Sequence, residues 1–183
     1  MTLPHLLLGM VSQPITGYEI KRAFDTSLRH FWTAELSQIY PALRALEQRG
    51  LLESERQPSP VGPARCLYRR TPDGTRELHE WLCADPVSAD TRLPYLGQLC
   101  FQGELRDADA SERFLIKLRD THAARVDALR AVEQAWFPDP DALSDDDFYA
   151  HLTLKFGLAR VESSLATCDA ALVALTHRRS KST

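Results

Sequence analysis

The chain has 183 residues, of which 44% are hydrophobic and 26% charged, and its formal net charge is −3. This length accommodates one large or two small domains and excludes most multi-domain enzymes, and no apolar run reaches the roughly 18 residues of a membrane span. The opening TLPHLLLGMV lacks the basic start and small-residue cleavage site of a signal peptide, so we expect a cytoplasmic protein.

The first two helices are predicted in residues 4–12 and about 17–29. The first is short and apolar, and Pro14 discourages its continuation. The second begins at a capping box, because Thr16 stands three residues before Glu19. Its core face would carry Ile20, Phe24 and Leu28.

The segment SQIYPALRALEQRGLLE, residues 37–53, predicts a third helix that ends at Gly50. Its core face would carry Ile39, Leu43 and Leu46. Its opposite face and flanks are polar and hold Ser37, Gln38, Tyr40, Pro41, Arg44 and Gln48. Because a proline is best tolerated near the first turn, Pro41 predicts that the helix starts close to Ser37 with free N–H groups there.

A hairpin and a fourth helix follow. The segments LLESERQ and RCLYRRT predict two strands, joined by the proline-rich link PSPVGPA. Alternation along the second strand points Tyr68 inward and Arg65 and Arg69 outward. Thr71 followed by Pro72 is a favoured helix start. This order of elements is typical of a winged helix-turn-helix, whose third helix enters the major groove of DNA.

The proline-bearing segment ADPVSADTRLP marks a domain boundary near residue 86. The fold class predicted is mainly α, with a winged helix-turn-helix DNA-binding domain at 1–85 and an all-helical domain at 86–183 for dimerisation and possible effector binding. Residues 1–82 hold ten Lys and Arg against nine Asp and Glu, whereas residues 83–183 hold twelve against sixteen. The front half is therefore the more basic, as phosphate binding favours.

Two long helices are predicted in the second half. One spans 110–136, with an apolar stripe of Leu115, Leu118, Val126, Leu129, Val132 and Trp136. The other starts at Ser144 and carries a heptad seam of Leu154, Leu158, Val161, Leu165, Cys168, Leu172 and Leu175. The seam can pair with the 110–136 helix in an antiparallel hairpin. We favour the interpretation that these helices also dock against a second copy of the chain, since a small helical arm buries little by itself.

Metal and catalytic sites are not expected. No CxxC pair occurs among the four cysteines, so mostly inert thiols are expected, with a redox sensor as the alternative. The histidines show no metal-ligand spacing, and His122 lies on an apolar stripe as a core or interface residue would. The run Asp145–Asp147 is typical of a helix start. No catalytic residue set or phosphate loop indicates an enzyme, and no cofactor is predicted.

Three segments together resemble the PadR family of transcriptional regulators over nearly all of residues 3–82. They are LLLGMVSQPITGYEIKRAF, FWTAELSQIYPALRALEQRGLLE and RCLYRRTPDGTRELHEWL, which contain the family's GYE start, FW pair, S-x-IYPAL recognition helix and wing exit. The helical second half looks like the effector and dimerisation region of the longer members, although Cys168 stands where a tryptophan is often found. The wing departs from the pattern at Pro63, Cys66 and Arg70, and Arg70 could restore a charge if it snorkels out of the core.

The resemblance implies a homodimeric DNA-binding repressor that acts on a palindromic operator and is released by a small-molecule effector, for which a small aromatic compound is the candidate. On the recognition helix, Arg44 can reach a guanine edge or a phosphate, Gln38 an adenine or a phosphate, and Ser37 and Tyr40 phosphate oxygens. Packing of Tyr40 against the first helix is an equal alternative. In the wing, Arg65 and Arg69 would contact the DNA backbone. Aromatic residues that could line an effector pocket are Trp32, Trp81, Tyr95, Phe101 and Trp136, although structural packing is the favoured role for most of them.

A second class of function remains open at this point. The winged helix could be a protein-interaction module, and the chain an assembly factor. Steep salt dependence of DNA affinity distinguishes the two hypotheses.

Overall fold

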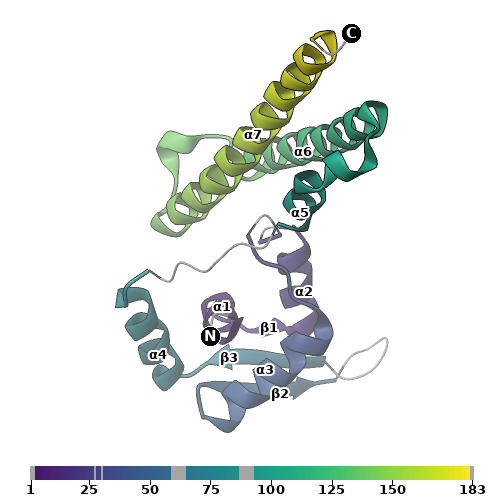
Figure 1. The fold of residues 1–183 in the computed structure, drawn as a ribbon. Helices are drawn as coiled ribbons and strands as arrows, with labels where there is room; N and C mark the ends of the chain where they lie inside the picture. Colours follow the sequence, from purple (N-terminus) through teal and green to yellow (C-terminus); the bar gives the residue numbers. More distant parts are fainter. Residues whose placement is uncertain (1–2, 27, 30, 59–64, 87–92, 182–183) are drawn as a thin grey trace. The chain divides into compact units, whose positions relative to one another are not determined.

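The computed structural model describes residues 3–26, 28–29, 31–58, 65–86 and 93–181 (Figure 1). The chain divides into two compact units, residues 1–88 and 89–183. The predicted hairpin tip at 59–64, including Pro63, and the segment 87–92 next to the predicted domain boundary lie outside the described residues.

The first unit contains the predicted helix, helix, helix, hairpin, helix order. Its elements are α1 (Leu3–Met10), β1 (Ile15–Thr16), α2 (Gly17–Thr26), α3 (Leu36–Gln48), β2 (Leu52–Gln57), β3 (Arg65–Arg70) and α4 (Pro72–Cys83). The strands are antiparallel in the order β1-β3-β2, and Tyr68 of β3 stands opposite both Ile15 and Ser54. The fold is therefore a winged helix-turn-helix, as the sequence predicts. β1 was not predicted, because its two residues are too few to show the alternating pattern of a strand.

Side-chain caps fix the starts of α2 and α4. The N–H of Thr16 donates to the Glu19 carboxylate at 2.8 Å, and the N–H of Glu19 donates to the Thr16 hydroxyl at 3.2 Å. These bonds hold the pKa of Glu19 below its ordinary value. At α4, the N–H of Gly74 donates to the Thr71 hydroxyl at 3.1 Å. Both predicted helix starts are confirmed.

The core of the first unit lies between the helices and the sheet. Its buried side chains include Leu7, Leu8, Ile20, Phe24, Ile39, Leu43, Leu46, Tyr68 and Leu78. The predicted inward direction of Tyr68 is confirmed, and burial, followed by a hydrogen bond with Cys66, raises the pKa of its phenol to about 12. Leu28 is only partly buried, because α2 ends at Thr26, before this predicted core position.

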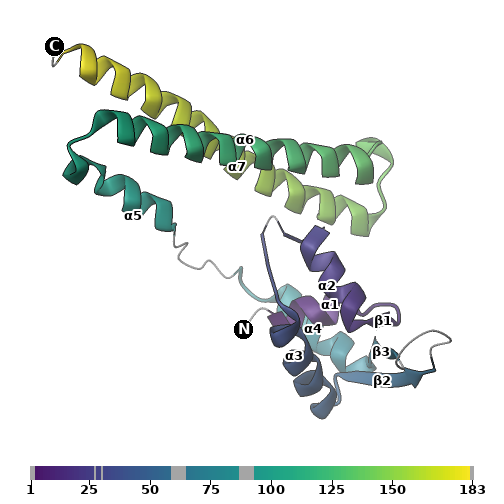
Figure 2. The same ribbon diagram turned by 90° about the vertical axis from the view of Figure 1, so that its right-hand side faces the viewer.

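The second unit is an antiparallel helical hairpin with a short helical lead-in (Figure 2). Its elements are α5 (Pro94–Cys100), the 3-10 helix η1 (Gln102–Leu105), α6 (Ala108–Trp136), the 3-10 helix η2 (Pro140–Ala142) and α7 (Asp145–Ser180). The start of α7 is the predicted one, because the N–H of Asp147 donates to the Ser144 hydroxyl at 3.2 Å. α5 and η1 are not predicted from the sequence, although Pro94 at a helix start is a signal for the former.

The α6–α7 contact buries the first half of the predicted heptad seam. Its buried cluster contains Val126, Leu129, Phe137, Leu154, Leu158 and Val161. Towards the end of α7 the seam is less covered, and Leu172 and Leu175 are half-buried. The prediction that Trp136 faces the core is wrong, since it is 58% exposed. It is the last residue of α6, and the next residue, Phe137, turns into the core in its place.

Candidate nucleic-acid interface

α3 is held by its apolar face and by a bridge from α2. Ile39, Leu43 and Leu46 are at most 1% exposed. The ammonium of Lys21 on α2 lies 2.5 Å from Asp25 and 3.3 Å from Glu35, the residue that caps α3. These contacts fix how α2 and α3 meet, so the polar face of α3 is presented on a rigid support.

The start of α3 lies close to Ser37, as the sequence predicts, although Pro41 stands further into the helix than expected. The helix begins at Leu36, and the N–H of Glu35 donates to the side-chain oxygen of Gln38 at 3.0 Å. Pro41 is therefore the sixth helical residue rather than a first-turn residue. The helix continues because a proline there removes only the N–H that would reach the Ser37 carbonyl. Within the described residues, the N–H groups of Leu36 and Ser37 have no acceptor, so the helix start offers donors to a phosphate.

The four residues predicted on this face are all exposed: Ser37, Gln38, Tyr40 and Arg44. Arg44 forms no hydrogen bond or ion pair with any other described residue. Because the Gln38 oxygen caps the helix, its NH₂ group is the part left for an outside acceptor. α3 therefore presents a guanidinium, an amide and two hydroxyls together.

Tyr40 packs on the start of α2 and is still 37% exposed. A Cβ atom placed on Gly17 would lie 2.7 Å from Cε1 of the Tyr40 ring. Tyr40 therefore packs within the unit, as the alternative predicts, and the contact at Gly17 is with α2. Gly17 is required here because any side chain would displace the ring.

The wing presents Arg65 and Arg69 outward, but their surroundings differ. Arg69 is paired with Glu53, which stands directly opposite on β2, and the Arg69 Nε lies 2.8 Å from the carboxylate. Arg65 has no ion pair with a described residue, and its charge contributes to the lowered pKa of Glu19. The guanidinium of Arg65 is therefore more available to bind a phosphate than that of Arg69.

Arg70 does not snorkel outward, so the idea that it restores a surface charge is wrong. Its guanidinium points inward and donates to the Leu8 carbonyl at 2.9 Å and to the Thr75 hydroxyl at 3.1 Å. These two acceptors are part-buried and give the charge hydrogen bonds that compensate for lost water. Arg70 therefore ties α1, β3 and α4 together.

Two exposed arginines were missed by the sequence analysis. Arg22 on α2 and Arg56 on β2 have side chains that bond to no other described residue. Arg22 could have been identified, because it lies off the Ile20 and Phe24 face of its helix. No pattern marks Arg56.

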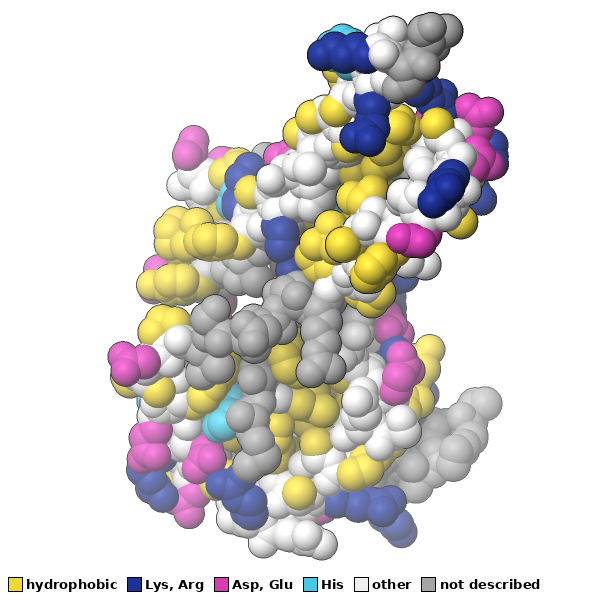
Figure 3. All heavy atoms as spheres, viewed as in Figure 1, with side chains coloured by type: hydrophobic (Ala, Val, Ile, Leu, Met, Phe, Trp, Pro, Cys, Tyr) yellow, Lys and Arg dark blue, Asp and Glu magenta, His cyan; other side chains and the backbone are white. Residues whose placement is uncertain are grey.

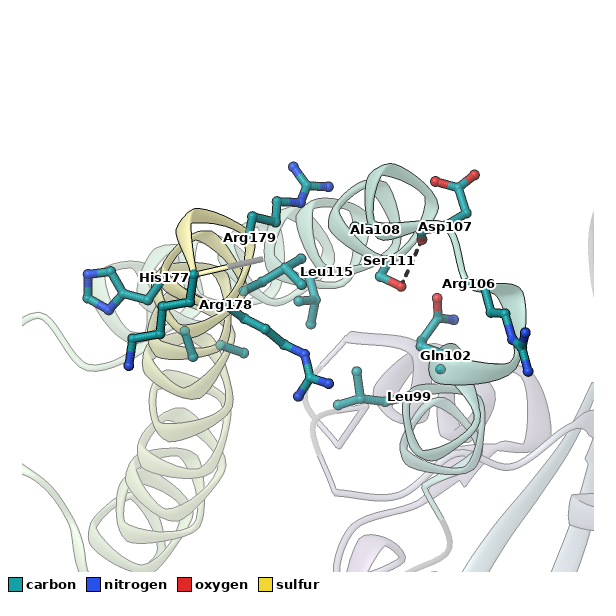
Figure 4. A pocket seen from close by; sticks show the side chains of 15 residues that line it. Leu99, Gln102, Arg106, Asp107, Ala108, Ser111, Leu115, His177, Arg178 and Arg179 are labelled. Atoms are coloured by element: carbon teal, nitrogen blue, oxygen red, sulfur yellow. Dashed lines mark hydrogen bonds between the residues drawn. The ribbon is translucent and has the colours of Figure 1, made fainter. Parts of the chain in front are cut away.

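The second unit contains a groove of about 1030 Å³ between α5, η1, the start of α6 and the end of α7 (Figure 4). Its lining combines the apolar Leu99, Leu115 and Leu175 with guanidinium groups at Arg106 and Arg178. The side-chain oxygen of Gln102 is buried there without a hydrogen-bond partner among the described residues.

None of the five aromatic residues considered for an effector pocket lines this groove, and most of them pack within the structure, the role favoured from the sequence. Trp81 stacks on His5 at 5.0 Å, and Tyr95 meets the edge of His122 at 5.6 Å. Trp32 packs partly buried against the core of the first unit, whereas Phe101 is 70% exposed. His122 is half-buried on α6 as predicted, but its Nε2 is buried without a hydrogen-bond partner among the described residues, so it is not the satisfied core histidine expected.

The described ranges contain neither a membrane-spanning helix nor a metal site. No helix found there combines the length and the apolar character that crossing a bilayer requires. In the same ranges, no three His, Cys, Asp or Glu side chains come together as a metal site would need.

Comparison with known proteins gives matches to both units. The model of the transcriptional regulator PadR-like family matches residues 6–80, and the model described as virulence activator alpha C-term matches residues 92–176. The protein named "Probable transcriptional regulator Rv1176c" from Mycobacterium tuberculosis is 30% identical, covering 98% of this chain and 100% of its own. The negative transcriptional regulator PadR of Bacillus subtilis is 28% identical, covering 91% and 97%.

Solved structures share the fold. Bacillus subtilis PadR in complex with operator DNA superposes with a TM-score of 0.85 at 23% identity, covering 96% of this chain and 99% of that one. The same protein in complex with p-coumaric acid gives a TM-score of 0.80 at 22% identity, with the same coverage.

Proposed function

The chain belongs to the transcriptional regulator PadR-like family, and on this premise we propose that it is a sequence-specific repressor that binds operator DNA. The observation that carries the proposal is the polar face of α3. A buried apolar face holds the helix, and the opposite face exposes Arg44 with no partner among the residues that the structure describes. An unpaired guanidinium on a rigidly supported helix is suited to bind a guanine edge or a phosphate.

Each residue of the interface has a role in this proposal. Arg44 reads a base or holds a phosphate, and the NH₂ group of Gln38 contacts an acceptor on a base or a phosphate. Ser37 and Tyr40 donate to phosphate oxygens, together with the free N–H groups at the helix start. Arg65 holds the backbone beside the groove. Arg69 contributes less, because Glu53 competes for its guanidinium.

We further propose that the protein acts as a homodimer. In this arrangement the region 1–85 binds DNA and the region 86–183 dimerises. Two-fold symmetry would place two α3 helices about one DNA turn apart, roughly 34 Å, and so select a palindromic operator. The heptad seam of α7, only half covered by α6, supports a role in association.

A small-molecule effector that releases the DNA is the third part of the proposal. The groove lined by Leu99, Leu115, Leu175, Arg106 and Arg178 has apolar and cationic walls, which suit a small aromatic or apolar anion. The p-coumaric acid complex of the Bacillus subtilis protein supports an effector of this kind. We propose no catalytic activity, and a cytoplasmic location, where operator DNA would be accessible.

A gel-shift titration and footprint on the promoter of the protein's own gene test the proposal. We expect a protected, roughly palindromic segment and an affinity that falls steeply as salt rises. Equal affinity for random DNA of the same length would refute sequence-specific binding. Binding to a protein partner with no DNA affinity would instead support the assembly-factor alternative, which the family membership does not favour.

A further inference from the structure

The two faces of the β2–β3 hairpin carry different charges. Side chains alternate along each strand, so the register of the pair sorts them between an outer and an inner face. The inner face continues the buried Leu52 and carries Ser54 and Arg56 on β2. Arg56 is the one charged residue of β2 on this face. The outer face mixes acids and bases: Glu53, Glu55, Gln57, Arg65, Leu67 and Arg69.

The inner face of the hairpin is the face that meets α3. The Ser54 hydroxyl donates a hydrogen bond to the Glu47 carboxylate of α3. Tyr68 stands opposite Ser54 on β3, and its pKa is raised mainly by burial, to which the nearby Glu47 and Tyr40 of α3 add. Arg56 therefore projects from the hairpin on the side of the recognition helix.

Arg44 and Arg56 lie on either side of the Glu47–Ser54 hydrogen bond. Arg44 comes one helical turn before Glu47, and Arg56 follows Ser54 on the same face, roughly 7 Å further along the strand. Both arginines are exposed, and neither bonds to any other described residue. Lys and Arg side chains lie along the lower edge of the first unit in the view of Figure 3, at the level of α3 and β2 in Figure 1. We call these four residues the α3–β2 corner.

Glu47 is the acid of this corner, and it is turned away from Arg44. Residues three apart on a helix are neighbours, so the two side chains are close enough in sequence to form an ion pair. The Glu47 carboxylate instead accepts the bond from Ser54 on β2. A carboxylate paired with Arg44 would compete with a phosphate for its guanidinium, as Glu53 does for Arg69. The Ser54 hydroxyl therefore helps to keep Arg44 available.

We propose that the α3–β2 corner extends the DNA-binding surface in two ways. Arg56 binds a backbone phosphate beside the groove that α3 enters, a contact without sequence preference. Ser54 is a positioning residue, which touches no DNA and holds the Glu47 carboxylate away from Arg44. This inference rests on the proposed DNA binding and adds to it two residues from β2, a strand with no assigned role so far.

Anisotropy titrations of Arg56→Ala on the footprinted operator and on a scrambled duplex test the phosphate contact. We expect affinity for both duplexes to fall at least about 5-fold, and the slope of log affinity against log salt to decrease by about 1 per subunit. Arg76→Ala is the matched control, because it removes the same charge from α4, where Arg76 is paired with Asp73 at 2.8 Å. It should stay within about 2-fold of the unmodified chain. Unchanged affinity and slope in Arg56→Ala would remove Arg56 from the surface.

A double-mutant cycle tests the positioning role of Ser54. Ser54→Ala frees Glu47 to pair with Arg44, so operator affinity should fall about 5-fold. Combining it with Glu47→Gln removes the competing charge, and the double variant should bind within about 2-fold of Glu47→Gln alone. Ser54→Thr keeps the hydroxyl and should bind like the unmodified chain. All of these side chains are exposed, so the variants should fold normally, as circular dichroism can check.

A purely structural role for Ser54 predicts a different result. If its hydrogen bond only ties α3 to β2, glutamine at position 47 still accepts that bond, and Ser54→Ala weakens binding equally in both backgrounds. A loss that Glu47→Gln does not rescue, or no loss at all in Ser54→Ala, would overturn the positioning role.

The inference and the proposed function give distinguishable failures. If the unmodified chain protects promoter DNA but Arg56→Ala and Ser54→Ala bind as tightly as it does, the repressor proposal stands and the corner proposal is wrong. If the unmodified chain binds no DNA, the repressor proposal is wrong and the corner proposal is wrong with it.

Discussion

Replacing Arg44 by alanine tests the recognition helix most sharply, because its effect on binding should be large and its effect on folding small. The side chain is exposed and bonds to no other described residue, so its truncation should change the free energy of unfolding by no more than about 0.5 kcal/mol. A base contact contributes about 1–3 kcal/mol. A dimer loses this contact twice, so the smallest expected loss of binding free energy is about 2 kcal/mol. That loss raises the dissociation constant roughly 30-fold.

The assay is fluorescence anisotropy on the footprinted operator and on a scrambled duplex, at fixed salt. Arg49→Ala is the matched control, since Arg49 ends the same helix but is paired with Glu77 at 2.9 Å. Arg44→Lys separates the two roles, because lysine keeps a phosphate contact but lacks the two-pronged geometry for guanine. An Arg44→Ala variant with unchanged operator affinity would refute the placement of this residue in the interface.

Three further predictions concern the wing and the core of the first unit. Arg65→Ala should weaken binding to all DNA sequences alike and reduce the slope of log affinity against log salt by about 1 per subunit; a sequence-dependent loss would argue against a backbone contact. Gly74→Ala should lower the free energy of unfolding by about 1–3 kcal/mol or more in urea titrations, because the added Cβ would lie 2.1 Å from the Leu51 carbonyl oxygen. Gly9→Ala, with nothing within 4 Å of the added atom, should not destabilise the protein. The folded-state pKa of Tyr68, about 12, exceeds its ordinary value of 10.0, so its contribution to stability is complete below pH 10 and is lost as pH rises towards 12. Tyr68→Phe should therefore lose less stability over that range, and an identical alkaline loss in both proteins would contradict the burial argument.

The buried framework that supports the candidate interface could be predicted from the sequence, because it depends on helix and strand periodicity. The three buried residues of α3, the capping box of α2 and the inward Tyr68 follow from helix and strand geometry alone. Pro41 predicted the start of α3 to within one residue of Ser37, but not its own place in the second turn, where a proline costs one hydrogen bond and does not end the helix. The spacing of Glu35 and Gln38 was the better signal.

Contacts between residues far apart in the sequence could not be predicted, because a local sequence pattern does not reveal them. The pairing of Arg69 with Glu53 depends on strand register, and the inward direction of Arg70 depends on the Leu8 carbonyl, which lies 62 residues away in sequence. The same limit applies to Trp136, whose exposure is decided by the turn after α6. Periodicity gives the face of a helix, but not which residue ends it.

Selection of binding sites from a random DNA pool, followed by sequencing, tests the central claim most directly. A repressor that reads DNA with two α3 helices should enrich a palindrome whose half-site centres are about 10 base pairs apart. The Arg44→Ala variant should lose preference at one position in each half-site. A pool that shows no enrichment, or enriches a single asymmetric site with no repeat, would contradict the account.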